Sequence, residues 1–154
     1  MRAHPNMMTG AQDHTAVRSD IKAVIDALRT LVWTTRPDGY VDFHNRCWSE
    51  YTGLRVDEAV GWGWQAIVPP EDRPWLLEHW QAIRASGEPS EDEGRLRRFD
   101  GEYRWFLVRN TPLRDATGRI VKWYGRKVSY IFLSPGQDDI TRARGLSRFP
   151  GFVL

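Results

Sequence analysis

Apolar positions near the start of the chain recur with the period of an α-helix. Intervals of three or four residues separate Val17, Ile21, Val24 and Leu28, and charged side chains occupy the opposite side. This spacing predicts an amphipathic helix over residues 13–30. Its apolar stripe must be covered, either by the domain's own sheet or by a second copy of the helix.

The pattern changes to that of β-strands after this helix. Two short β-rich runs, residues 31–35 and 40–44, flank a Pro-Asp-Gly sequence and predict a hairpin. Three longer strands, joined by two turns that contain glycine, are predicted over residues 91–99, 102–114 and 119–132.

Helical segments separate the first two strands from the last three. Asn45 is suited to cap a short helix over residues 46–52, which Gly53 can end. Pro74 suits the first turn of a longer helix that continues to Gly87. The order of elements predicts an α+β fold, with a five-stranded antiparallel sheet, helices on one face, and the N-terminal amphipathic helix in addition.

The sequence is compatible with two registers of the hairpin over residues 91–114. A two-residue loop of Asp100 and Gly101 would place Leu96 opposite Trp105, whereas a three-residue loop would place it opposite Phe106.

Composition and charge exclude several classes of protein. The chain has 154 residues, 8 of them Trp, and a formal net charge of +2. The single cysteine, Cys47, excludes an internal disulfide and a multi-cysteine zinc site and suits a reducing compartment. The sequence has no signal peptide and no apolar run of about 18 residues, so we expect a cytoplasmic protein that does not enter a membrane. The small charge gives no argument for nucleic-acid binding.

From about Leu31 to Ser129 the chain carries a series of residues in a characteristic order. They are Trp33, Asp38-Gly39, Asn45, Trp48, Thr52-Gly53, Gly61, Trp64, Pro70, Asp72, Trp80, the strand block 93–106, Pro112-Leu-Arg-Asp115, Gly118 and Lys122-Trp-Tyr-Gly125. In this order and spacing they resemble the PAS domains common at the front of bacterial sensor histidine kinases. Two positions depart from that pattern, because Pro69 stands where His is usual and Ser129 replaces an Asp that helps couple such domains to an effector.

The resemblance implies a sensory, signal-transduction domain with a cavity between the inner sheet face and the helices. The light-oxygen-voltage branch needs a cysteine beside its flavin just after the position of Gly61, where this chain has Trp64. Haem needs an axial ligand, and His79 is expected to be exposed on a polar helix face. We therefore expect no cofactor, neither a flavin adduct nor haem, and the residue spacing indicates no metal site.

No arrangement of residues indicates catalysis. The serines lack a glycine elbow and His-Asp companions. The acidic residues between positions 88 and 93 stand beside several arginines, which predicts cross-strand charge pairs on a solvated face. Kinase phospho-acceptor and ATP-binding segments are absent from the sequence, so we expect no enzymatic activity, although a histidine kinase could be attached in the parent protein.

The resemblance and the many aromatic residues together predict a binding cavity. Its expected lining is Phe43, Trp48, Tyr51, Trp64, Trp80, Leu96, Arg104, Phe106, Val108, Trp123 and Lys127. Such a cavity would accept a small, partly aromatic or acidic molecule, oriented by Arg104 and Lys127. Two alternatives remain: a closed core in a ligand-free protein–protein adaptor, and a small-ligand enzyme on a similar α+β fold.

Apolar side chains on both faces of the strand at 102–114 indicate that the outer sheet face is covered. We expect a homodimer in which the helix over residues 13–30 covers it, through the residues Val17, Ile21, Val24, Leu28, Trp105, Leu107 and Tyr124. A downstream signalling effector is a further possible partner. The predicted organisation is a disordered segment at 1–12, the helix at 13–30, the PAS domain at 31–132 and a linker or tail at 133–154.

Overall fold

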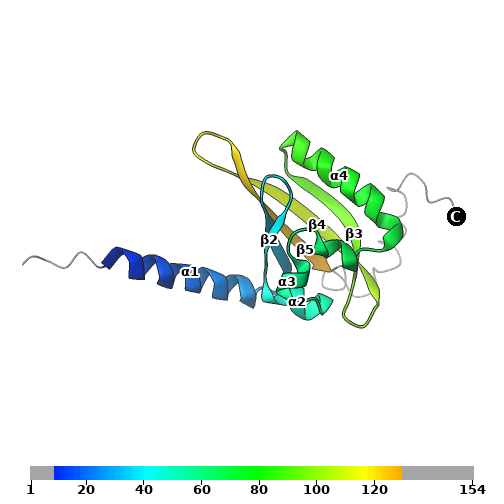
Figure 1. Cartoon of the computed structure of the whole chain (residues 1–154), viewed down its shortest axis with the longest axis horizontal. Coiled ribbons are helices and arrows are strands. Elements are labelled where there is room, and N and C mark those ends of the chain that lie inside the picture. Colours follow the sequence, from blue (N-terminus) through cyan, green and yellow to red (C-terminus); the bar gives the residue numbers. More distant parts are fainter. Residues whose placement is uncertain (1–8, 130–154) are drawn as a thin grey trace, which may run out of the picture.

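The computed structural model describes residues 9–129, with side chains for residues 16–128. Five antiparallel strands form one sheet in the order β2-β1-β5-β4-β3 (Figure 1). The strands are β1 (Leu31–Thr35), β2 (Val41–His44), β3 (Ser90–Arg97), β4 (Tyr103–Arg114) and β5 (Ile120–Ser129). The sheet confirms the predicted α+β architecture. The last predicted strand residues, 130–132, and the predicted linker at 133–154 lie outside the described residues.

The helices of the predicted insert lie on one face of this sheet (Figure 1). They are α2 (Arg46–Thr52), α3 (Val56–Ala59), the 3₁₀ turns η1 (Gly63–Ile67) and η2 (Pro70–Asp72), and α4 (Arg73–Ser86). Asn45 caps α2 as predicted, and Gly87 ends α4 in the left-handed conformation with a φ of 70°. Among the described residues, no helix is both long and apolar enough to cross a bilayer.

The first helix, α1 (Thr9–Ala27), starts earlier and ends sooner than the sequence predicts. Residues 9–12, predicted to be disordered, are helical. In Figure 1 this helix extends away from the sheet, and its apolar stripe is 50–64% exposed at Val17, Ile21 and Val24. Leu28, directly after the helix, is 43% exposed. Within one chain the sheet therefore does not cover the stripe.

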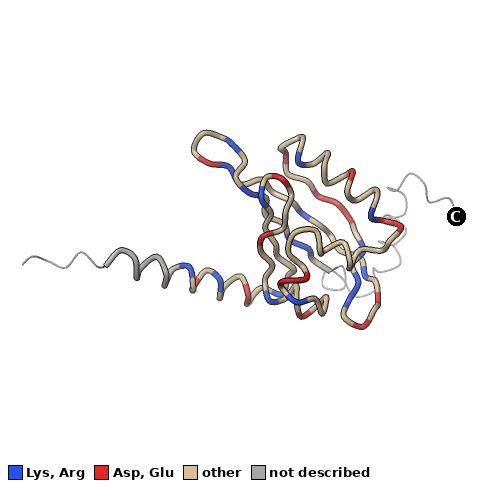
Figure 2. Tube along the Cα trace, viewed as in Figure 1, with Lys and Arg blue, Asp and Glu red and all other residues tan. Residues whose placement is uncertain are grey.

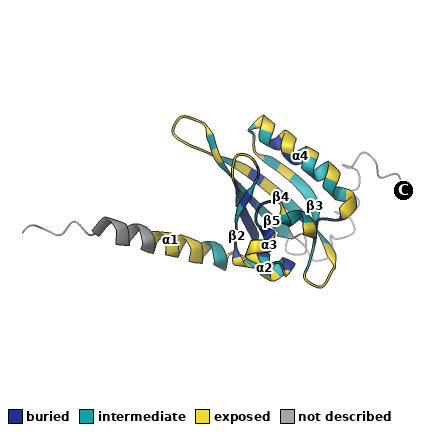
Figure 3. Cartoon of the chain, viewed as in Figure 1, coloured by how far each residue is buried: buried dark blue, intermediate teal, exposed yellow. Residues whose placement is uncertain are grey.

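The core lies between the inner sheet face and the insert helices (Figure 3). Its centre includes Leu31, Trp48, Ile67, Leu96 and Phe106, each no more than 2% exposed. Burial of such large apolar side chains is the main source of stability in a domain of this size.

One glycine allows a tryptophan to lie directly on the sheet. Trp33 in β1 pairs with Gly125 in β5, and a Cβ atom at residue 125 would lie 2.1 Å from the Trp33 ring. The missing side chain thus makes room for the indole, which forms part of the cavity described below.

The β3–β4 register differs from both predicted alternatives. Leu96 lies opposite Arg104, not opposite Trp105 or Phe106. The turn begins earlier than predicted because the N–H of Phe99 leaves the ladder and donates to a backbone carbonyl of α2 at 2.9 Å. This tertiary contact is not visible in the local sequence.

The acidic residues between positions 88 and 93 lie at the start of β3, which is an edge strand of the sheet (Figure 2). Glu91 pairs across the ladder with Arg109 at 2.5 Å, as the predicted charge pairing requires. Asp92, the next residue, faces the opposite way and contacts α4 through His79. Neighbouring acidic residues therefore form ion pairs on opposite faces of the strand.

Candidate functional site

A partly enclosed cavity of about 80 Å³ lies between the inner sheet face and α4. This volume is several times the 10–15 Å³ or so that one water molecule needs. Its wall is mostly apolar and aromatic, and all five strands contribute. The lining comprises Trp33, Thr35, Val41, His44, Trp48, Trp64, Val68, Asp72, Trp75, Leu76, His79, Trp80, Ile83, Asp92, Glu93, Gly94, Arg95, Val108, Asn110 and Lys127.

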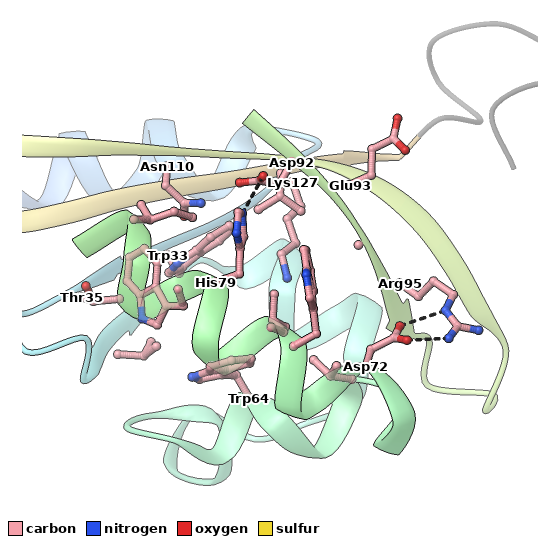
Figure 4. A pocket seen from close by; sticks show the side chains of 18 of the residues that line it. Trp33, Thr35, Trp64, Asp72, His79, Asp92, Glu93, Arg95, Asn110 and Lys127 are labelled. Carbon is pink, nitrogen blue, oxygen red and sulfur yellow. Dashed lines mark hydrogen bonds and ion pairs between the residues drawn. The ribbon is translucent and has the colours of Figure 1, made fainter. Parts of the chain in front are cut away.

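Lys127 is the buried cation of this cavity. It lies on the central strand β5, and its side chain points from the sheet into the space below it (Figure 4). The residue is 8% exposed, and its Nζ lies 5.2 Å from the ring centroid of Trp33 and 5.4 Å from that of Trp48. Burial lowers the pKa of Lys127 from 10.5 to about 7. Two indole faces, both attractive to a cation, thus flank an otherwise desolvated ammonium.

His44 lies next to this group at the end of β2. Its ring centroid is 4.5 Å from that of Trp48, and neither ring nitrogen has a hydrogen-bond partner within residues 9–129. Burial, and then the positive charge of Lys127, lower the pKa of His44 from 6.5 to about 4. The imidazole is therefore neutral at pH 7.

A second group of polar side chains is more exposed and already paired. Nε2 of His79 lies 2.7 Å from a carboxylate oxygen of Asp92, and the His79 ring stacks on Trp75. Arg95 forms two hydrogen bonds to Asp72, at 2.8 and 3.0 Å (Figure 4). The prediction of an exposed His79 on a polar helix face is wrong, because the residue lines the cavity and faces the sheet.

The structure brings together five of the eleven predicted cavity residues. Those that line the cavity are Trp48, Trp64, Trp80, Val108 and Lys127. The other six lie elsewhere, namely Phe43, Tyr51, Leu96, Arg104, Phe106 and Trp123.

Contacts elsewhere in the fold explain why five of these six residues do not line the cavity. Tyr51 and Phe106 form an edge-to-face pair with centroids 5.2 Å apart. Leu96 and Trp123 are each 1% exposed inside core clusters. Arg104 lies beside the hairpin loop, where it binds the Glu102 carboxylate at 2.7 Å. The remaining one, Phe43, lies on β2 and is half-buried.

Several lining residues that carry polar or aromatic chemistry are not predicted from the sequence. Trp33 and His44 are paired neighbours on β1 and β2, and both reach the cavity. Residues two positions apart on a strand face the same side of a sheet, so a buried Leu31 could have indicated that Trp33 also faces inward. His79 and Asp92 meet only through the tertiary packing of α4 on β3, for which no local signal exists.

The cavity wall contains no cysteine among the described residues. Trp64, the residue found where the light-oxygen-voltage branch needs its cysteine, lines the cavity. Cys47 instead packs half-buried against the core, where burial raises the pKa of its thiol. No group of three or more His, Cys, Asp or Glu side chains in the described part of the chain is placed to hold a metal ion.

Comparison with known proteins identifies relatives of this chain. A family model described as "PAS fold" matches residues 41–126. The peroxide stress-activated histidine kinase mak1 of Schizosaccharomyces pombe is 36% identical over 106 residues, which is 68% of this chain and 6% of the kinase. The uncharacterized protein y4lL of Sinorhizobium fredii is 37% identical over 93 residues, 60% of this chain and 11% of that protein. The chain thus spans a small part of the curated relatives that it matches.

A solved structure shares the fold over most of the chain. It is an RNA-binding light-oxygen-voltage receptor, which matches with a TM-score of 0.68 at 15% identity and covers 96% of this chain and 41% of that one. At this identity the match concerns the fold alone.

Proposed function

Because the chain belongs to the PAS-fold family and is a sensory domain, we propose that it senses a small molecule bound in the cavity between the sheet and α4. We further propose that it is not itself an enzyme and that it acts in the cytoplasm on a downstream effector such as a histidine kinase. In this proposal it needs no cofactor and contacts neither membrane nor nucleic acid.

The observation that carries this proposal is the composition of the cavity. A closed adaptor core would fill its interior with apolar side chains and leave no buried cation. Here the interior retains about 80 Å³ of space beside Lys127 and His44, two polar side chains without hydrogen bonds inside the described structure. A concave apolar site with a few placed polar groups is the usual form of a small-molecule site.

Filling the cavity tests this proposal. Val108 lies opposite Lys127 and lines the cavity, so Val108→Trp should occupy the space with an indole. We expect the variant to melt close to the parent protein and to lose the increase in melting temperature that millimolar indole or benzoate gives the parent. Val121→Trp on β5 is the matched control, because Val121 is 40% exposed and outside the cavity.

The closed-adaptor alternative predicts the opposite result for the same variant. If no space is available for the new side chain, Val108→Trp overpacks the core and costs about 1–3 kcal/mol of stability. Such a loss, together with no shift of the parent by either probe, would contradict the sensor proposal.

We also propose that α1 mediates formation of a homodimer. Its stripe is exposed in the single chain, and the outer-face residues Trp105, Leu107 and Tyr124 are half-buried. Ile21→Glu and Val24→Glu are expected to convert a dimer to a monomer in sedimentation velocity, because each places a charge in the covered stripe. Arg18→Glu, on the polar side of α1, should leave the dimer intact. A monomeric parent protein would overturn this proposal.

A further inference from the structure

We propose that the ligand of the cavity is an anion, a flat single-ring carboxylate whose carboxylate group accepts hydrogen bonds from the Lys127 ammonium. The inference rests on the proposed sensory function and specifies the chemistry of its ligand. It is carried by the surroundings of Lys127.

Lys127 lacks the partner that a buried ammonium normally has. No carboxylate of the described residues lies within 4.0 Å of its Nζ, and none of its three donor positions is used in a hydrogen bond among them. Buried charges in proteins are otherwise paired or hydrogen-bonded. The cavity therefore contains an unused cationic donor, more than nine-tenths buried.

Two of the three carboxylates in the cavity wall are paired with basic side chains. Asp92 pairs with His79, and Asp72 forms a bidentate pair with Arg95. An external carboxylate can therefore bind Lys127 without competing with an existing ion pair. An ammonium without a carboxylate partner among the described residues favours an anion over a cation or a neutral molecule at this end of the cavity.

His44 provides a second polar group at the same end. Its ring nitrogens have no hydrogen-bond partner in the described part of the chain, so the neutral imidazole can donate one N–H to a ligand oxygen. A carboxylate has two oxygens and could accept from Lys127 with one and from His44 with the other.

The shape of the wall selects a flat ligand of one ring. Trp33 and Trp48 contact the ammonium with their ring faces, and Trp64 and Trp80 add further indole surface to the same cavity. Aromatic walls of this kind favour planar apolar groups by stacking and edge contacts. The cavity is small, at about 80 Å³, and partly enclosed, which favours a compact ligand of about one ring over a larger one.

Benzoate and benzamide test the inference, because they share one ring and differ in charge. We expect isothermal titration of the full chain at pH 6.5 to show benzoate binding at least about tenfold more tightly than benzamide. In Lys127→Met, which keeps the length of the side chain and removes the charge, benzoate affinity should fall about tenfold to a hundredfold, the usual range for a charged hydrogen bond. Benzamide affinity should stay within about twofold.

Lys122→Met is the matched control. Lys122 lies on the same strand but is partly exposed and paired with Asp42, so its loss should leave benzoate affinity within about twofold of the parent. Equal binding of benzoate and benzamide by the parent would overturn the inference. So would unchanged benzoate affinity in Lys127→Met, or no benzoate binding to the parent.

Failure of the inference and failure of the sensor proposal give different results. If the parent binds indole, and Val108→Trp abolishes that binding, the cavity is a ligand site even when benzoate shows no preference. If neither indole nor benzoate binds, both proposals fall together.

Discussion

Asn45→Ala is expected to lower the free energy of unfolding by about 2–5 kcal/mol. The side chain is 1% exposed and holds three elements together. Its Oδ1 accepts from the N–H groups of Val32 in β1 and Trp48 in α2, at 3.0 and 3.3 Å. Its Nδ2 donates to the carbonyls of Ile25 and Thr30, at 3.2 and 2.9 Å.

The expected size follows from adding two effects. Loss of a helix N-cap alone costs about 0.5–2 kcal/mol, and leaving the buried N–H of Val32 without its partner costs about 1–3 kcal/mol more. Urea unfolding followed by tryptophan fluorescence measures the difference. Asn45→Asp is the informative comparison, because it keeps the acceptor, loses both donors, and should be intermediate in stability. A loss below about 0.5 kcal/mol for the alanine variant would show that the bridge is unimportant.

The same residue shows how far local sequence determines this fold. The helix over residues 46–52 was predicted with the bounds that the structure has, since Asn45 and Gly53 act through contacts within one turn. The hydrogen bonds of Asn45 to α1 and β1 connect residues 13 to 20 positions apart, and only the fold brings these groups together. Capping is thus visible in the sequence, whereas the bridge is not.

The cavity shows how much of the candidate site can be predicted from the sequence. Val108 and Lys127 were predicted to line it, and they are paired neighbours on β4 and β5. The sequence does not predict that His79 lines the cavity, because the position of His79 depends on how α4 packs over β3. Phe106 was predicted to line the cavity but lies in the core, because Tyr51 from α2 covers it. Strand alternation shows which face a side chain occupies, but helix packing determines which part of that face stays open.

Lys127→Met is expected to stabilise the unliganded domain at neutral pH, by about 2–4 kcal/mol. Burial lowers the pKa of Lys127 to about 7, whereas an unfolded chain keeps the ordinary value of 10.5. Between these values the unfolded state binds the extra proton, so the parent becomes more stable as the pH rises. The penalty for the buried charge is fully present below about pH 7 and fades toward pH 10.5. The methionine variant has no such group.

The measurement is therefore the difference in unfolding free energy between variant and parent as a function of pH. We expect this difference to shrink by about 2–4 kcal/mol between pH 7 and pH 10, while other titrating groups cancel because both proteins contain them. Lys122→Met should show no comparable trend. A constant difference across this range would show that Lys127 stays charged in the fold, held by Trp33 and Trp48 alone. A loss of stability in the methionine variant at pH 7 would contradict the prediction outright. A lysine that destabilises the empty domain is consistent with a role in binding, because a bound anion removes the same penalty that the substitution removes.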